Sequence, residues 1–401
     1  MTASLLASVE MAPRDPILGI TEAYHADPNP KKVNLGVGVY GDDSGKVPLL
    51  ECVRRVDQAI LENEAPWSYL PIDGLPLYDK AVQALVFGAD SATVTRGHGV
   101  TVQALGGTGA LKVGADFLRR ISPNARVLIS DPSWENHRAL FEQAGFEVSA
   151  YPYYHAATHG LDFPGMVSAL EKASPGTIVV LHVCCHNPTG VDLEPGQWAQ
   201  VIEIVKARDL VPFLDSAYQG FAEGVDADGA IVREFARACS PVFVASSFSK
   251  SFSLYGERVG ALSVATASTE ESARVLSQLK RVVRANYSNP PTHGGRAVSM
   301  ILTTPELRAL WEKELGGMRE RIRAMRKGLV ERIHARVPGS DFSFVMRQRG
   351  MFSYSGLTKA QVVRLREEFS VYAIETGRIC VAALNSRNID YAADAIAAVM
   401  R

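Results

Sequence analysis

The sequence predicts an α/β fold with a large domain, built on a mostly parallel central sheet with helices on both faces, and a smaller α+β domain. Three observations lead to this prediction: a length of 401 residues, an ordinary share of 47% hydrophobic residues, and apolar β-type runs that alternate with helical stretches. The chain exceeds one small core, because compact units usually hold about 100 to 200 residues. We expect the large domain at 46–310, and a small domain that combines an N-terminal arm, 1–45, with residues 311–401.

The strands of the large domain are predicted from short apolar runs between about residues 100 and 265. Their alternation with helical stretches predicts parallel strands joined by crossover helices. The runs are apolar throughout because helices would cover both faces of the sheet. We expect these strands at 126–130, 177–182, 210–214, 242–245 and 259–264.

Beyond residue 305 the pattern changes to charged, helix-periodic stretches and shorter apolar runs. The stretch 305–334 predicts a long helix that bridges the domains, and we expect the N-terminal arm, through about Gly45, to pack on the small domain. The other elements expected here are a helix at 359–369 and strands at 342–345, 350–355 and 379–382.

Composition excludes several classes of partner. Lys and Arg (42) balance Asp and Glu (43), so the net charge of -1 provides no long-range attraction to nucleic acid or to an anionic membrane. Residues 1–13 lack a basic stretch followed by a long apolar core, and no apolar run is long enough to span a membrane. The five scattered cysteines fit reduced thiols. We therefore expect a cytoplasmic protein.

Two patterns in the sequence are misleading. Residues 36–41 match the dinucleotide fingerprint G-x-G-x-x-G, but a turn and Pro48 follow where that motif needs a helix, so an extended loop that contacts substrate is preferred. Cys184 and Cys185 stand between His182 and His186, yet the spacing matches no usual zinc pattern and the run resembles a buried strand. We expect no metal site.

Gly106-Gly-Thr-Gly-Ala-Leu111 follows an extended stretch, 100–105, and opens a helix that continues through Arg120. Free backbone N–H groups and the helix dipole would bind a phosphate there, with the Thr108 hydroxyl as a further donor. The alternative is a glycine-rich turn that serves packing alone.

Charged and hydroxyl side chains that could bind a ligand also lie at the ends of two other predicted strands. Asp215 ends one of them, where a carboxylate needs a positive partner such as the protonated ring nitrogen of a pyridoxal cofactor, and Tyr218 could donate to the ring oxygen. Lys250 follows another strand among serine hydroxyls, and Arg258 offers a fork of donors to a phosphate. Taken singly, Asp215 could be an exposed turn residue and Lys250 an ordinary surface lysine.

Four further residues are candidates for the site, although each of them, taken alone, could equally have a structural role or lie on the surface. Asn187 lies in an N-P-x-G turn, which is commonly structural, and Trp134 could be a core residue or could stack on a cofactor. Arg378 and Arg284 could be surface groups, but a 2-oxo acid needs one bidentate carboxylate clamp and a dicarboxylate needs two.

Together these motifs make the chain resemble the class I, fold-type-I aminotransferases that depend on pyridoxal 5'-phosphate (PLP), in the aspartate and aromatic amino-acid branch. The resemblance covers nearly the whole chain and is carried by segments 33–40, 69–74, 186–190, 249–258 and 284–291 and by Arg378. Segments 103–117, 131–137 and 181–187 look most like the bacterial tyrosine (aromatic) enzymes, although aspartate aminotransferases share much of them.

The resemblance implies a role for each candidate residue. Lys250 would form the Schiff base with PLP, Asp215 would pair with the ring nitrogen with support from His137, and Trp134 would stack on the ring. Asn187 and Tyr218 would bond the ring oxygen, so that Lys250, Asp215, Tyr218 and Trp134 form the catalytic set. The phosphate would be held by Gly107, Thr108, Ser247 and Arg258, and by Tyr69 from the partner subunit of a homodimer. The substrate would meet Val37, Gly38, Arg378 at its α-carboxylate, and Arg284 of the other chain at a distal carboxylate.

The implied activity is ping-pong transamination of tyrosine, phenylalanine and also aspartate with 2-oxoglutarate. A strict aspartate aminotransferase is the main alternative. Decarboxylation or β-elimination on the same fold, and a non-catalytic PLP-fold regulator, are weaker ones, the last because neither a DNA-binding appendage nor a lost lysine is seen.

Overall fold

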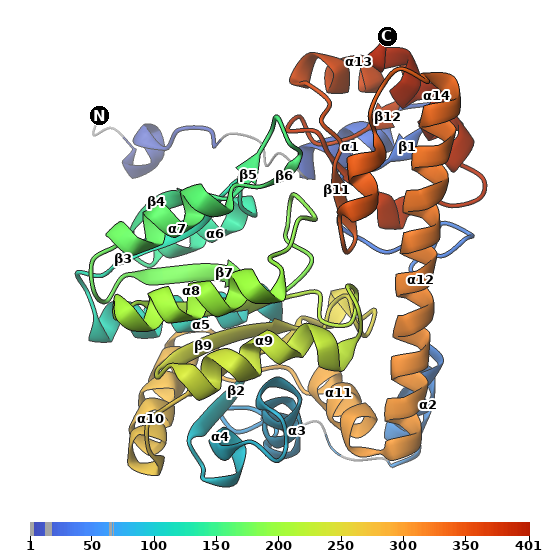
Figure 1. Cartoon of the computed structure of the whole chain (residues 1–401). Coiled ribbons are helices and arrows are strands. Elements are labelled where there is room, and N and C mark those ends of the chain that lie inside the picture. The colour runs from blue at the N-terminus through green and yellow to red at the C-terminus, as the bar shows by residue number, and fades with distance from the viewer. Residues whose placement is uncertain (1–3, 13–17, 64–65, 67) are drawn as a thin grey trace.

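A seven-stranded sheet forms the centre of the protein in the computed structural model, which describes residues 4–12, 18–63, 66 and 68–401. The strand order is β2-β10-β9-β8-β7-β3-β4. Neighbours from β9 to β4 pair in parallel, whereas β10 is antiparallel to both β9 and β2 (Figure 1). The strands are β2 (Gly99–Leu105), β3 (Arg126–Asp131), β4 (Glu147–Pro152), β7 (Ile178–His182), β8 (Val211–Ser216), β9 (Val242–Ser247) and β10 (Val259–Ala265).

The strands predicted for the large domain are all present, but the prediction that the strand at 259–264 is parallel is wrong. A parallel connection needs a crossover of a dozen or more residues, usually a helix. Only residues 248–258 join β9 to β10, and they contain a single short 3-10 helix, Tyr255–Glu257. The chain therefore returns directly beside β9, so both ends of this connection lie at the same edge of the sheet.

Helices cover both faces of the sheet, as the uniformly apolar strands predict. Alternate residues of one strand enter different cores: Phe213 packs with side chains of α5, α6 and α10, and Leu214 packs with those of α3 and α7 to α9. In Figure 1, α8 and α9 lie in front of the sheet. These helices are α3 (Pro76–Phe87), α5 (Gly106–Ile121), α6 (Glu135–Gln143), α7 (Phe163–Lys172), α8 (Pro195–Ala207), α9 (Val225–Ala238) and α10 (Thr269–Asn286).

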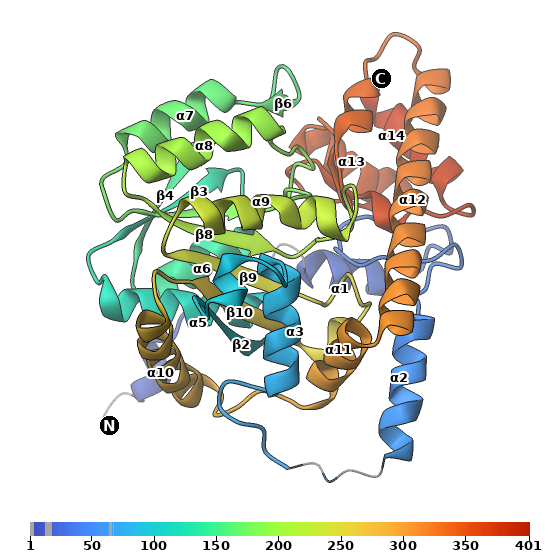
Figure 2. The same ribbon diagram turned by 60° about the horizontal axis from the view of Figure 1, so that its bottom comes forward.

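The second unit lies at the far end of α12, the long helix that runs along one side of the molecule in both views (Figures 1 and 2). The predicted helices 305–334 and 359–369 are confirmed as α12 (Pro305–Arg336) and α13 (Lys359–Phe369). The predicted strands 350–355 and 379–382 are confirmed in part, as β11 (Phe352–Tyr354) and β13 (Arg378–Cys380), which pair with each other. The other elements of this unit are β12 (Val371–Tyr372) and α14 (Ile389–Met400).

The prediction of a strand at 342–345 is wrong, because Ser343–Arg347 form a 3-10 helix. The carboxylate of Asp341 accepts hydrogen bonds from both the backbone nitrogen and the hydroxyl of Ser343, which favours a turn over an extended backbone.

The N-terminal arm packs on this unit over the part that follows residue 18. Strand β1 (Val33–Asn34) pairs in parallel with β12, and the backbone nitrogen of Cys380 donates to the oxygen of Leu35. The short 3-10 helix Leu5–Ser8 instead lies on the opposite side of the molecule from α14, so the expectation fails for this first segment (Figures 1 and 2). Residues 1–3 and 13–17 of the predicted arm lie outside the described residues. The domain limits at 45 and 310 stay predictions.

Six further elements complete the set of α-helices and strands in the described part of the chain. No helix in the described part of the chain combines the length and the apolar character that a membrane span requires. These elements are α1 (Leu18–Ala26), α2 (Glu51–Glu62), α4 (Ala92–Thr95), α11 (His293–Thr303), β5 (Tyr154–His155) and β6 (Gly160–Leu161).

Candidate active site

A cavity of about 480 Å³ opens at the edge of the sheet where the parallel strands end. Side chains reach it from the residues that follow β2, β3, β7 and β9, and from the end of β8, which is where open parallel sheets bind ligands. The structure brings most of the predicted site residues together here: Gly38, Gly107, Thr108, Trp134, Asn187, Asp215, Tyr218, Ser247, Lys250, Arg258 and Arg378.

Lys250 lies in the turn after β9, with its Nζ 5.1 Å from the centre of the Tyr218 ring. Burial and the nearby charge of Arg258 lower the pKa of this amine, and Asp215 opposes the shift. The net lowering favours the neutral amine, which is the form that attacks a carbonyl carbon. Lys250 therefore brings an amine with a lowered pKa into the cavity.

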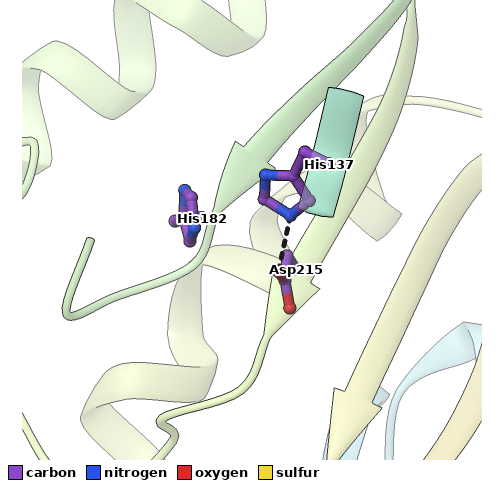
Figure 3. Close-up of side chains that lie close together, drawn as sticks. All are labelled: His137, His182 and Asp215. Carbon is purple, nitrogen blue, oxygen red and sulfur yellow. Dashed lines mark hydrogen bonds and ion pairs between the residues drawn. The ribbon is translucent and has the colours of Figure 1, made fainter. Parts of the chain in front are cut away.

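Asp215 is fixed by His137, which lies on α6 (Figure 3). His137 Nε2 lies 2.8 Å from Asp215 Oδ2, and His137 Nδ1 shares a hydrogen bond of 2.9 Å with Ser133 Oγ. Burial alone would raise the pKa of Asp215, but the hydrogen bond from His137 and the charges of neighbouring groups outweigh it and hold the pKa below its usual value. The cavity thus contains a carboxylate that stays ionised.

His182 stands beside this pair in Figure 3, and sequence reasoning considered it only as part of a metal pattern with the two cysteines. Within the described residues, the group close enough to hold a metal ion is instead His137, His182 and Asp215, whose ligand atoms lie within 4.8 Å of one another. Burial lowers the pKa of His182 to about 3, so its ring is neutral. Since Asp215 already bonds His137, the geometry favours a hydrogen-bonded pair facing an organic ligand.

The start of α5 forms a cradle for an anion. No side chain caps this helix, so the N–H groups of its first turn remain free to bind a ligand. Gly106 has a φ of +68°, a left-handed conformation that favours glycine, and the guanidinium of Arg258 lies directly against it, 2.4 Å from where a Cβ atom would be. Arg258 Nη1 donates to Ser249 Oγ over 3.2 Å. Backbone, hydroxyl and guanidinium donors thus converge on one place, as phosphate binding requires.

Arg378 is buried at the opposite side of the cavity, with 1% of its surface exposed. Its Nη2 donates to the oxygen of Gly36 over 2.7 Å and its Nη1 to Asn187 Oδ1 over 3.1 Å. Its Nε has no hydrogen-bond partner among the described residues. Because Arg378 lines the cavity, its guanidinium places a positive charge where an anionic ligand can bind.

Three predicted site residues lie outside the cavity of the single chain. Tyr69 is 91% exposed, and Arg284 is exposed at the end of α10, where it donates to Ser288 Oγ over 2.5 Å. Val37 lines a different cavity together with Val39 and Tyr40. The resemblance assigns Tyr69 and Arg284 to a partner's site, so their roles stay predictions.

Several lining residues were missed by the sequence reasoning. Ser249 and Tyr255 stand in the same connection between β9 and β10 as Lys250, so their closeness in sequence to a candidate lysine was a usable signal. Phe352 lies on the short strand β11, and its ring centre is 4.4 Å from the guanidinium carbon of Arg378. Nothing in its local pattern distinguishes it from a core residue. The full set missed is Leu111, His182, Ala217, Ser249, Tyr255 and Phe352.

Comparison with known proteins identifies relatives that match along the whole chain. The family model described as aminotransferase class I and II matches residues 30–396. An aspartate aminotransferase of Pseudomonas aeruginosa is 60% identical over 397 residues, which cover 99% of this chain and 100% of that protein. An aromatic-amino-acid aminotransferase of Escherichia coli is 50% identical over 389 residues, which cover 96% and 98%. The crystal structure of an aromatic-amino-acid aminotransferase from Burkholderia pseudomallei, covalently bound to pyridoxal phosphate, matches with a TM-score of 0.97 and 67% identity, over 99% of this chain and 100% of that one.

Proposed function

Because the chain belongs to the class I and II aminotransferase family, in its aspartate and aromatic branch, and uses pyridoxal phosphate, we propose that it transfers amino groups from tyrosine, phenylalanine and aspartate to 2-oxoglutarate. Relatives with both aspartate and aromatic names match over nearly the full chain, which supports a site that accepts both kinds of side chain. The single observation that carries the proposal is the convergence of Lys250, Asp215 and Arg258 on one cavity.

The cavity fits the cofactor on the chemistry of its donors. The cradle at the start of α5 suits the phosphate, the ionised Asp215 suits a protonated ring nitrogen, and the amine of Lys250 suits covalent attachment. A Cβ atom on Gly107 would lie 2.9 Å from Ser247 Cβ, so glycine keeps this space open. When bound, the cofactor supplies an electron sink that stabilises negative charge at the substrate's α-carbon.

In this proposal the protein residues bind the substrate and move its protons. Arg378 would clamp the α-carboxylate, because its guanidinium lines the cavity and is held in place by Gly36 and Asn187. With the cofactor bound, the Nζ of Lys250 would be the general base that takes the substrate's α-proton, and the same amine would hold that proton and give it back later in the reaction. Burial raises the pKa of Tyr218, so its hydroxyl remains a donor toward the ring oxygen. Trp134 borders the cavity, where it would cover one face of the cofactor ring.

A homodimer that shares its sites is part of the proposal. Arg284 would reach the distal carboxylate of a substrate in the partner's cavity, and Tyr69 the phosphate. Both side chains are exposed in the single chain, as are the large apolar side chains Leu49, Leu61 and Leu77, which supports burial by a second copy. To accept an aromatic ring, Arg284 must swing aside or have its charge balanced by polar neighbours and water, because an unpaired buried charge is costly. The cytoplasmic location expected from the sequence belongs to this proposal as well.

The second candidate is a strict aspartate aminotransferase, which the name of the Pseudomonas relative favours. Initial rates with phenylalanine, tyrosine and aspartate, each with 2-oxoglutarate, distinguish the two. We expect kcat/KM for the aromatic substrates to lie within about 10- to 200-fold of that for aspartate, since a lost side-chain contact is worth about 1–3 kcal/mol. Negligible turnover of both aromatic substrates would leave aspartate aminotransfer as the function.

A further inference from the structure

The loop 183–192 carries Asn187 into the cavity, and Asp192 closes this loop from behind. Asp192 Oδ2 accepts a hydrogen bond from the backbone nitrogen of Cys185 over 2.8 Å, and its Oδ1 accepts one from His186 over 2.9 Å. These two residues immediately precede Asn187. One carboxylate therefore fixes the main chain directly before a side chain of the site.

The backbone at Cys185 has an unfavourable conformation that neighbouring groups must stabilise. Cys185 has a φ of +54°, a left-handed conformation that is unfavourable for a residue with a Cβ atom. Strained residues of this kind persist only where the surroundings hold them. Gly350 packs against Cys185 so closely that a Cβ on Gly350 would lie 2.4 Å from Cys185 Cβ. Asp192 supplies the charged hydrogen bonds on the other side.

The other side-chain contacts of His186 are made with neutral groups. His186 shares hydrogen bonds with Thr189 Oγ1 (2.8 Å) and Ser130 Oγ (2.9 Å), and its ring stacks on Tyr153 at a centre distance of 3.9 Å. Charged acceptors make stronger hydrogen bonds than neutral ones. Asp192 is therefore the strongest single restraint on Cys185 and His186 that these contacts provide.

Asp192 is ionised under ordinary conditions although it is mostly buried. Burial raises its pKa to about 6, while the bonds from His186 and Cys185 and the charge of Arg349 favour the carboxylate. Asp228 lies close enough to raise the pKa further. Above this pKa both oxygens accept hydrogen bonds and neither donates, which is what the two facing N–H groups require.

We propose that Asp192 is a positioning residue for the transamination site, which holds Asn187 where it can orient Arg378 and meet the cofactor. The link is direct, since Asn187 Oδ1 accepts the bond from Arg378 Nη1. A cavity of about 260 Å³ lies behind the loop and is lined by Cys184, Asp192 and Asp228, so the loop has room to shift once the carboxylate is lost. The inference depends on the roles proposed above for Asn187 and Arg378.

The test compares Asp192→Asn with Asp228→Asn. Asp228 is a matched control because it lines the same small cavity and its carboxylate also accepts backbone bonds, from Gly220 (2.8 Å), Ala222 (3.0 Å) and Glu223 (2.9 Å). For each purified variant we would measure KM and kcat, the Kd of the apoprotein for pyridoxal phosphate by fluorescence titration, and the Tm.

Asp192→Asn should raise KM for amino-acid substrates and weaken cofactor binding, each about tenfold or more, because displacements of about 1 Å at a site cost up to about a hundredfold. Asp228→Asn should lower the Tm but leave KM and Kd within about twofold, since no residue that it bonds enters the site. Unchanged KM and Kd in Asp192→Asn, or an equal rise in both variants, overturns the proposal.

A double-mutant cycle with Asn187→Ala separates this inference from the proposed function. If Asp192 acts through Asn187, the double variant should be no worse than Asn187→Ala alone, whereas additive losses contradict the inference. If Asn187→Ala itself leaves KM and Kd unchanged, the proposed role of Asn187 fails instead. If Asp192→Asn does not fold, Asp192→Ser takes its place, because serine keeps a hydroxyl that can accept a hydrogen bond. KM and Kd are then compared in the same double-mutant cycle with Asn187→Ala, and additive losses again contradict the inference.

Discussion

His137 Nε2 lies 2.8 Å from Asp215 Oδ2, and the two side chains are 0% and 5% exposed. The ionised carboxylate leaves the imidazole N–H as the donor, and the bond fixes the carboxylate at the end of β8 toward the cavity. A buried charge in this position stabilises a positive partner far more than a solvated charge would. The His137–Asp215 pair therefore keeps a negative charge in the cavity that can stabilise a positively charged group of a ligand.

Asp215→Asn removes this charge while it keeps the shape of the side chain. We expect kcat/KM to fall by about a hundredfold or more, because a preorganised charge at a reacting group is worth about that factor. His137→Gln, which leaves the carboxylate in place, should cost less. Steady-state kinetics of the two variants give the ranking, and an Asp215→Asn enzyme of normal activity would disprove the assignment.

The two arginines proposed for carboxylate binding can be told apart by substrate. Arg378→Met should raise KM about ten- to a hundredfold for aspartate and phenylalanine alike, because charge-assisted hydrogen bonds are worth about 1.5–3 kcal/mol. Arg284→Met should affect aspartate and 2-oxoglutarate but spare phenylalanine. A loss confined to dicarboxylates in both variants, or in neither, would contradict the proposed division.

Arg258 is predicted to bind the cofactor through its phosphate. Arg258→Gln should weaken binding of pyridoxal phosphate to the apoprotein about tenfold or more, since a guanidinium bond to a phosphate is among the stronger hydrogen bonds. Arg281→Gln, at an exposed position on α10, is the matched control. Equilibrium titration at two salt concentrations measures both, and equal affinities would argue against a phosphate contact.

Asp79 predicts a pH-dependent stability. Burial first, and the charge of Asp73 second, raise the pKa of Asp79 to about 9, and its Oδ1 has no hydrogen-bond partner among the described residues. At neutral pH the carboxyl is thus protonated in the folded state and ionised in the unfolded state. Its contribution to stability is present below the unfolded pKa and is lost as the pH rises toward the folded value.

Asp79→Asn removes this pH-dependent loss. Relative to the unmodified protein, the variant should gain free energy of unfolding as the pH rises from 5 to 8, by about 1 kcal/mol or more, because each unit of pKa difference corresponds to about 1.4 kcal/mol. Denaturant unfolding at both pH values measures the gain. If the stability gain of Asp79→Asn over the unmodified protein instead became smaller from pH 5 to pH 8, the pKa of Asp79 would not be raised in the folded state.

The convergence of most candidate side chains on one cavity could be predicted from the sequence, whereas part of the sheet could not. Lys250, Asp215 and Asn187 were found because they follow apolar runs, and the strand ends of a parallel sheet share one edge. The direction of β10 was wrong because a strand buried on both faces has the same apolar pattern in either direction. The edge strand β4 was missed because exposed residues such as Glu147 and Ser149 break the apolar run.

Other site residues required the coordinates themselves. Phe352 reaches the cavity from β11, whose partner β13 brings Arg378 beside it, and this pairing joins residues that are far from Lys250 in the chain. His182 ends a buried strand, where an apolar environment and a ligand-facing position look alike in sequence. Long-range register, which depends on the whole fold, decides both positions.

Borohydride reduction of the cofactor-loaded enzyme, followed by peptide mapping with mass spectrometry, tests the central claim most directly. Reduction fixes the cofactor to the amine that carries it. The expected result is a pyridoxyl-phosphate mass on the peptide that contains Lys250, and no such label in the Lys250→Ala variant. A label on any other lysine would contradict the account.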